Sequence, residues 1–283
     1  MKAKLLIKKE GLKTIKDLSL SEYQEIKNAI YYLDDFDYLN FLSVNHIKAR
    51  DDFRNFDFSA PTIKEVDAFN IIFNALNSIV TNLNLWQSYL KRNYFDDTDV
   101  YSIEEKEKEK QNKGYKAKSC YDLSDSDLYD NVVEYAVMKA LRNLAVHSQK
   151  PYSDIIYFDD WSRHFVIYTR DLLEGDILNK SGKEIVIKSK YDYFDVVQVI
   201  EESFKALETL NVYIYNMLLN KNCKNYYSSR LIIKEYLPME FDGAYLTWIN
   251  DEYCDNHILK AESKNISINA MNRILGIASE NAG

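Results

Sequence analysis

The chain has few of the residues that interrupt regular structure. Its 283 residues include only 7 Gly and 3 Pro, which favours long uninterrupted helices over a turn-rich sandwich or a glycine-loop nucleotide fold. Its 3 Cys, at positions 120, 223 and 254, show no C-x-x-C spacing. An odd set of isolated cysteines indicates reduced thiols rather than a disulfide framework or a zinc site.

Long apolar runs and excess positive charge are also missing. The N-terminal run Leu5-Leu6-Ile7 lies between lysines and is far shorter than a signal-peptide core, and no later run is long enough to span a bilayer. We therefore expect a cytoplasmic protein without a membrane partner. The formal net charge of -8 disfavours indiscriminate nucleic-acid binding, because the summed field repels a polyanion. A local basic groove is compatible with this charge.

Acidic residues gather at several points of the chain, for example at Asp34-Asp35 and Asp159-Asp160. No acid-x-Lys nuclease core accompanies them, so solvated loop acids are a better interpretation than a metal-dependent nuclease. We expect neither a metal site nor a cofactor.

Three helical patterns predict a bundle over residues 19–150. The first begins at the capping-box sequence Ser19-Leu20-Ser21-Glu22, and the second begins at Thr62–Glu65 with an apolar stripe that continues to Tyr94. A third helix is expected from Ser124–Asp127 to His147, because Pro151 follows closely and favours termination. Residues 1–18 form a Lys-rich N-terminal segment outside this bundle.

Residues 96–118 form a charged connection within the bundle, centred on the run from Glu104 to Lys110. Alternating charge of this kind is typical of a solvated, mobile connection or an exposed helix. The alternative is an arm that contacts RNA, which the glutamates weaken everywhere except at the Lys113–Lys118 end.

The sequence changes character after Pro151. Short β-branched and aromatic runs at Ile155–Phe158, Phe165–Tyr168 and Glu184–Lys188 predict a small antiparallel meander over residues 151–193. Helical periodicity returns at Phe194, so residues 194–283 are expected to add helices that pack on the bundle, including helices near 231–236 and 266–277. The predicted fold is mainly α, with the meander inserted or appended after the third helix.

The hexapeptide Arg142-Asn143-Leu144-Ala145-Val146-His147 lies near the end of the third helix. At about 100° per residue, Lys139, Arg142, Asn143 and His147 fall opposite an apolar face. A fixed cation and a titratable imidazole are the groups that metal-free cleavage of a phosphodiester needs. The structural alternative is a surface cation and a helix-end histidine favoured by the helix dipole. The other histidines, His46, His164 and His257, lack a partner at diagnostic spacing and are interpreted as structural.

The Arg142-Asn143-x-x-x-His147 spacing resembles the HEPN superfamily, whose ribonuclease members carry R-x4-6-H near the end of a bundle helix, often with Asn after the Arg. The resemblance covers roughly residues 19–150 and is closest to abortive-infection and toxin-type members. The subclass paired with nucleotidyltransferase antitoxins carries Tyr two residues after the His, whereas this chain has Gln149. The resemblance therefore favours a helical bundle, but not that toxin subclass.

The resemblance implies a metal-independent endoribonuclease that cleaves tRNA or other RNA as a toxin or phage-defence effector. It implies that Arg142 stabilises the developing phosphorane charge and that His147 acts as general acid or base, while Asn143 holds the imidazole or a phosphate oxygen by hydrogen bonding. Lys139 is a candidate RNA-binding residue, and a solvated lysine is the alternative. It also implies a homodimer with a composite active site, with an antitoxin or regulatory protein as a possible partner. The alternative is a catalytically silent HEPN module that binds RNA or protein.

Overall fold

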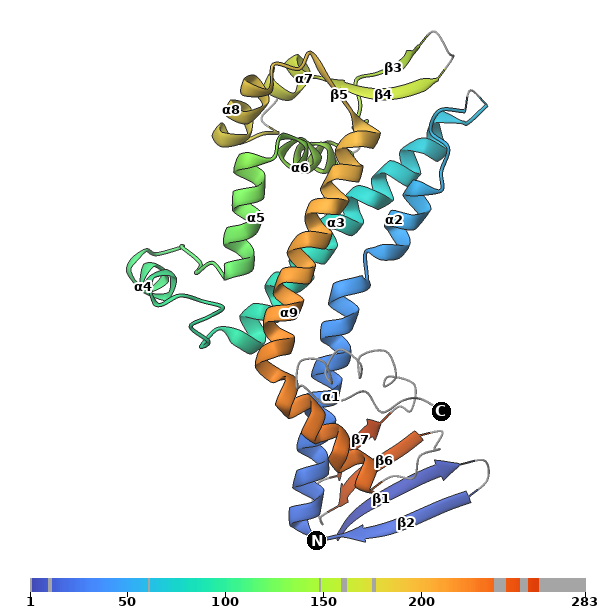
Figure 1. Cartoon of the computed structure of the whole chain (residues 1–283), viewed down its shortest axis with the longest axis vertical. Coiled ribbons are helices and arrows are strands. Elements are labelled where there is room, and N and C mark those ends of the chain that lie inside the picture. The colour runs from blue at the N-terminus through green and yellow to red at the C-terminus, as the bar shows by residue number, and fades with distance from the viewer. Residues whose placement is uncertain are drawn as a thin grey trace. The chain divides into compact units, whose positions relative to one another are not determined.

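The computed structural model describes residues 2–9, 12–60, 62–147, 149–158, 162–174, 177–236, 243–249 and 254–259. Helices dominate these residues (Figure 1), so the expectation of a mainly α protein is confirmed. The chain divides into two compact units, of which the first contains residues 1–41 and 215–283 and the second contains residues 42–214. Among the described helices, none combines the length and apolarity needed to cross a membrane.

The first unit contains a four-stranded antiparallel sheet in the order β2-β1-β6-β7. Its strands are β1 (Lys2–Lys9), β2 (Leu12–Leu18), β6 (Gly243–Ile249) and β7 (Cys254–Leu259). In the central strand, Leu6 faces Ile15 of β2 on one side and Tyr245 of β6 on the other. The two ends of the chain therefore build one sheet.

This sheet corrects one expectation, because strands β6 and β7 occupy part of the range 194–283 in which only helices are expected. In the Lys-rich segment, for which no helix or strand is expected, residues 2–9 and 12–18 pair as antiparallel strands. Both pairs of strands are short, and they gain stability by pairing with each other rather than as isolated hairpins. The helix expected near 266–277 lies outside the described residues.

Among its described residues, the first unit also contains α1 (Leu20–Val44) up to Phe41 and the part of α9 (Val196–Tyr236) from Tyr215 onward. The predicted capping box is confirmed: the Ser19 N–H donates to the Glu22 carboxylate at 2.8 Å, and the Glu22 N–H donates to Ser19 Oγ at 3.2 Å. Seven residues form the buried apolar cluster of this unit: Leu18, Tyr23, Ile26, Ala29, Ile30, Leu33 and Ile233. Residues 231–236 are part of α9 and not a separate helix.

The second unit is a helical assembly that carries a small sheet (Figure 1). Its helices, besides α9 up to Ile214, are α2 (Ile47–Arg54), α3 (Glu65–Tyr94), α4 (Ile103–Gln111), α5 (Cys120–Asn131), α6 (Val133–Val146), α7 (Thr169–Glu174) and α8 (Lys180–Ser189). Its sheet is antiparallel in the order β3-β4-β5, with β3 (Asp154–Tyr157), β4 (Arg163–Tyr168) and β5 (Tyr193–Asp195).

The small antiparallel sheet after the motif helix is confirmed, but its third strand lies elsewhere than expected. Residues Glu184–Lys188 belong to α8, and the third strand is Tyr193–Asp195. Asn179 caps α8 by accepting the Gly182 N–H at 2.8 Å. A capped helix with its Val186 side chain buried outweighs the β propensity of the Ile-Val-Ile run.

The third predicted helix is divided in two at Val132. This residue has an extended backbone (φ -115°, ψ 106°) and serves as the C-cap of α5 and the N-cap of α6. The Asn131 side chain donates to the Asp127 carbonyl at 3.0 Å, and β-branched Val132 and Val133 follow it. Local side-chain bonding and β-branching both lower the preference for a continuous helix at this point.

Helix α6 is buried on nearly every side, and its fully buried residues are Tyr135, Ala136, Val137, Met138, Ala140, Leu141 and Ala145. These positions cover most of the helical circumference, and Lys139, Arg142 and Asn143 are partly buried. The half of the helix opposite the expected apolar face is therefore not an open surface. The chain becomes exposed again only at Val146 and His147.

The charged connection contains an ordered helix, α4, and one of its glutamates is buried. Glu105 is 5% exposed. Its carboxylate accepts hydrogen bonds from Tyr115 Oη at 2.7 Å, the Lys118 N–H at 3.0 Å and Lys108 Nζ at 2.9 Å. These donors lower the pKa of Glu105 to about 2, the Tyr115 hydroxyl most strongly. Glu105 on α4 therefore holds Tyr115 and Lys118, in the segment that follows α4, against this helix.

We predict that Glu105 contributes acid-sensitive stability. Its folded pKa lies below the usual value of 4.5, so its contribution is complete above about pH 4.5 and is lost as the pH falls towards 2. Urea unfolding at pH 7 and pH 3 should show a smaller difference in unfolding free energy for Glu105→Gln than for the wild type. Exposed Glu107→Gln is the control and should keep the wild-type pH dependence.

Candidate functional site

The Arg142 side chain lies half-buried in the penultimate turn of α6. Its Nη1 donates to Asn143 Oδ1 at 3.4 Å, and its Nε is buried with no hydrogen-bond partner among the described residues. No carboxylate within the described part of the chain forms an ion pair with it. A guanidinium is always charged and presents several donors in one plane, so Arg142 has donors left for an anion.

His147 lies at the C-cap of α6, as expected from the nearby proline. Its backbone N–H donates to the carbonyls of Asn143 and Leu144 at 3.2 and 3.1 Å. Its imidazole is exposed and makes no hydrogen bond or ion pair to the described residues. The structure thus brings Arg142 and Asn143 into side-chain contact, whereas His147 is joined to Asn143 through the backbone.

Lys139, the candidate RNA-binding residue, is held by a carboxylate. Its Nζ lies 2.8 and 3.0 Å from the two carboxylate oxygens of Asp125 on α5, and Tyr135 Oη donates to the same carboxylate at 2.7 Å. The rings of Tyr129 and Tyr135 lie 5.4 and 5.2 Å from the ammonium. This cluster ties α5 to α6 across the break at Val132. An RNA contact by Lys139 stays a prediction.

A second polar cluster, which sequence reasoning missed, consists of Ser162 just before β4, His164 on β4 and Asp195 at the end of β5. His164 Nδ1 lies 2.6 Å from Asp195 Oδ2, and His164 Nε2 lies 3.3 Å from Ser162 Oγ. Ser162 and His164 share a face of one extended segment because they are two residues apart, which the sequence makes visible. Asp195 comes 31 residues after His164, and no local pattern signals that contact.

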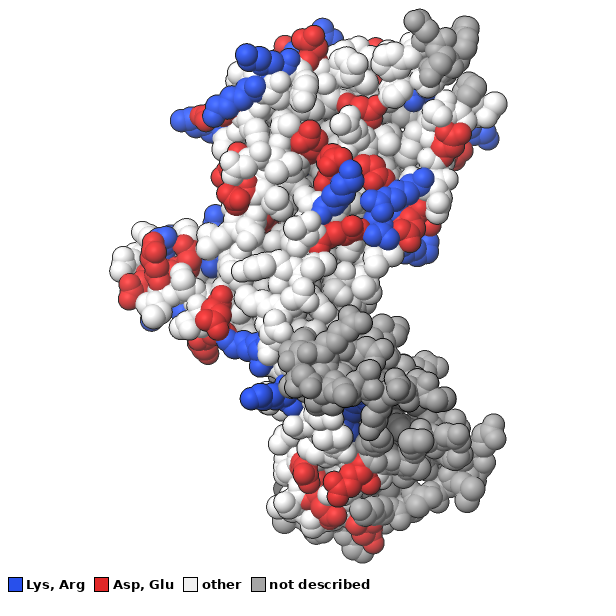
Figure 2. All heavy atoms as spheres, viewed as in Figure 1, with Lys and Arg blue, Asp and Glu red and all other residues white. Residues whose placement is uncertain are grey.

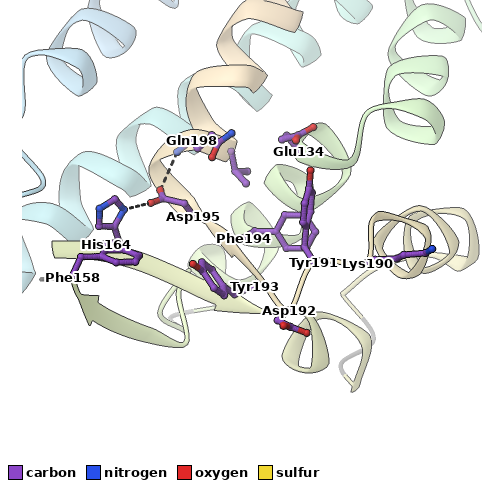
Figure 3. Close-up of a pocket in the computed structure, with 11 residues that line it drawn as sticks. Glu134, Phe158, His164, Lys190, Tyr191, Asp192, Tyr193, Phe194, Asp195 and Gln198 are labelled. Atoms are coloured by element: carbon purple, nitrogen blue, oxygen red, sulfur yellow. Dashed lines mark hydrogen bonds and ion pairs between the residues drawn. The ribbon is translucent and has the colours of Figure 1, made fainter. Parts of the chain in front are cut away.

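A pocket of about 570 Å³ lies beside this cluster. Figure 3 shows His164 and Asp195 directed at each other at one end, with Tyr193 and Phe194 along the wall. Glu134, in the first turn of α6, lines the same pocket. Helix α6 therefore carries a pocket residue at its start and the Arg142–His147 motif at its end.

Charges of both signs are mixed on the described surface seen in Figure 2. On the face shown in Figure 2, the described Lys and Arg side chains are interspersed with Asp and Glu and form no continuous positive surface. In the described ranges, no three His, Cys, Asp or Glu side chains come together as a group that would hold a metal ion.

A scan against protein-family models, a search of curated proteins and a search of solved structures gave no match to this chain. Its function must therefore be inferred from its own residues and their geometry.

We predict that Lys139 is needed for stability. Lys139→Met leaves the poorly exposed Asp125 carboxylate with Tyr135 as its remaining donor, which should lower the unfolding free energy by about 1–3 kcal/mol. Urea unfolding measures this loss. Exposed Lys188→Met is the control, and the double variant Asp125→Asn with Lys139→Met should recover much of the loss. An unchanged stability in Lys139→Met would contradict a structural role for the pair.

Proposed function

We propose that the chain is a metal-independent endoribonuclease of HEPN type, acting as a toxin or phage-defence effector on tRNA or other RNA. The observation that carries this proposal is the half-buried Arg142, which has a buried Nε without a partner and no carboxylate among the described residues. An unpaired, partly desolvated guanidinium attracts an anion strongly, and phosphate matches its planar donors.

The proposed reaction is an internal transesterification. The ribose 2'-hydroxyl loses its proton and attacks the adjacent phosphorus, the bond from phosphorus to the 5'-oxygen breaks, and the leaving oxygen gains a proton. The products are a 2',3'-cyclic phosphate and a 5'-hydroxyl. Arg142 would stabilise the charge that develops on the phosphorane, and His147 would transfer one of the two protons.

Asn143 has a positioning role in this proposal. Its Oδ1 accepts from Arg142 Nη1, and its carbonyl accepts the N–H of His147. It therefore contacts both proposed catalytic residues, one through its side chain and the other through its backbone. Its side-chain contact holds one edge of the guanidinium and leaves the other donors for phosphate.

The reaction needs a base and an acid, and one copy of α6 offers one exposed imidazole. A two-fold dimer supplies a second His147 and a second Arg142 to the same scissile bond. We therefore propose a homodimer with a composite site, whose activity an antitoxin or regulatory protein restrains. The alternative is a catalytically silent module that binds RNA or a protein through the same residues.

We predict that Arg142→Ala and His147→Ala each lower RNA cleavage by about 10² to 10⁴-fold. Arg142→Lys should recover little, because an ammonium lacks the planar pair of donors. RNA-end sequencing after induction gives the site and the end chemistry, and growth inhibition gives the cellular effect. Exposed Arg92→Ala is the matched control.

Cleavage that disappears with EDTA would overturn the metal-independent mechanism. RNA binding by the wild type without any cleavage would instead favour the silent module.

We also predict that the two inactive variants do not complement each other. A heterodimer of Arg142→Ala with His147→Ala keeps one Arg142 and one His147 at the composite site, so the reaction lacks either its base or its acid. Purified mixtures measured after subunit exchange should therefore not regain the wild-type rate of cleavage. Full recovery of activity in a verified heterodimer would argue against a second His147 at the scissile bond.

A further inference from the structure

The Ser162, His164 and Asp195 side chains form a continuous hydrogen-bonded chain. With its proton on Nδ1, His164 donates to Asp195 Oδ2 at 2.6 Å, and its Nε2 is then free to accept the Ser162 Oγ proton across 3.3 Å. A nucleophilic serine needs this order of groups: a base within reach of the hydroxyl, and an acceptor that fixes the tautomer of the base. None of these residues belongs to the Arg142–His147 motif.

Neighbouring residues hold the Asp195 and His164 side chains in place. Asp195 Oδ1 accepts the N–H groups of Val197 and Gln198 at 2.8 and 3.1 Å, which leaves Oδ2 for the imidazole. The His164 ring stands edge-on to Phe158, with ring centroids 4.7 Å apart. The side chain of Asp195 is 19% exposed and that of His164 is 38% exposed. The orienting carboxylate is therefore shielded, while the base remains within reach of a ligand.

The pocket gives a substrate a place next to the base. His164 and Asp195 line one end of it, and Ser162, which is not a lining residue, adjoins it through His164 Nε2. Phe158, Tyr193 and Phe194 add ring surface to the lining, which also contains the charged residues Glu134, Lys190 and Asp192 (Figure 3). Its volume of about 570 Å³ lies within the range of small-molecule sites.

The shape of the pocket rim follows from the end of α8. Lys190, which lines the pocket, is the C-cap of α8 and has φ 59°, the left-handed conformation in which helices commonly end. The segment that follows is held at the start of α7, where the Thr169 N–H donates to the Asp192 carbonyl at 3.0 Å. The rim of the pocket is therefore held at two points.

We propose that Ser162, His164 and Asp195 form a second active site, which hydrolyses carboxylic esters whose apolar or aromatic group occupies the pocket. Ser162 Oγ bonds to the carbonyl carbon while its proton passes to His164 Nε2. The bond from that carbon to the alkoxy oxygen then breaks, and the alcohol leaves with the proton from His164. Water, deprotonated by His164, attacks the acyl-enzyme, which releases the acid and returns the proton to Ser162.

The full chain tests this with two probes. A fluorophosphonate should form a bond from phosphorus to Ser162 Oγ with loss of fluoride, located by peptide mass spectrometry, and 4-nitrophenyl butyrate should be hydrolysed. Ser162→Ala should abolish labelling and hydrolysis. Asp195→Asn keeps the Oδ1 acceptor for α9 but favours the wrong imidazole tautomer, so it should slow turnover by up to about 10⁴-fold.

The control is Ser181→Ala, since Ser181 Oγ donates to the Asp130 carboxylate and has no imidazole partner. Thermal unfolding followed by circular dichroism establishes that each variant is folded. An unlabelled wild type, or a folded Ser162→Ala that is still labelled and active, would overturn the proposal. Arg142→Ala should keep the esterase activity and Ser162→Ala should keep RNA cleavage, so the two proposed activities fail independently.

Discussion

The second unit depends on the near-complete burial of α6. A helix surrounded by protein on most sides must satisfy the charges that it brings inside, because an unpaired buried charge costs several kcal/mol. Lys139 meets this constraint through Asp125, with Tyr135 as a further donor to the same carboxylate. Arg142 does not meet it through any carboxylate among the described residues. Arg142 lies about one turn before His147, where α6 ends and the chain becomes exposed. An anion that reaches this end of α6 could therefore supply the missing partner.

The same burial separates the two proposed sites. Glu134 lines the pocket in the first turn of α6, and His147 caps its other end. A helix rises about 1.5 Å per residue, so the 14 residues of α6 span about 21 Å. The two sites thus share a rigid element without sharing residues. A change in the packing of α6 would alter the geometry of both proposed sites. A side-chain substitution at one site leaves the side chains of the other site in place.

Features set by neighbouring residues were predictable from the sequence. The Ser19 capping box, the start of α3 at Glu65, the end of α6 at His147 and the β3–β4 hairpin all follow from local side-chain chemistry. Contacts between distant residues were not. The pairing of β1 with β6 and the contact of His164 with Asp195 join positions that no periodicity relates. The strand predicted over Glu184–Lys188 was wrong for another reason. These residues belong to α8, because helix capping and burial outweigh the β propensity of the Ile-Val-Ile run.

The pairing of β1 with β6 has a consequence for the order in which the protein folds during synthesis. The second unit is one continuous stretch, residues 42–214, and is complete while the rest of α9 is still being made. The β1–β2 hairpin leaves the ribosome first, yet its partner strand begins only at Gly243. Until then one edge of β1 has unsatisfied backbone groups that could pair with another chain.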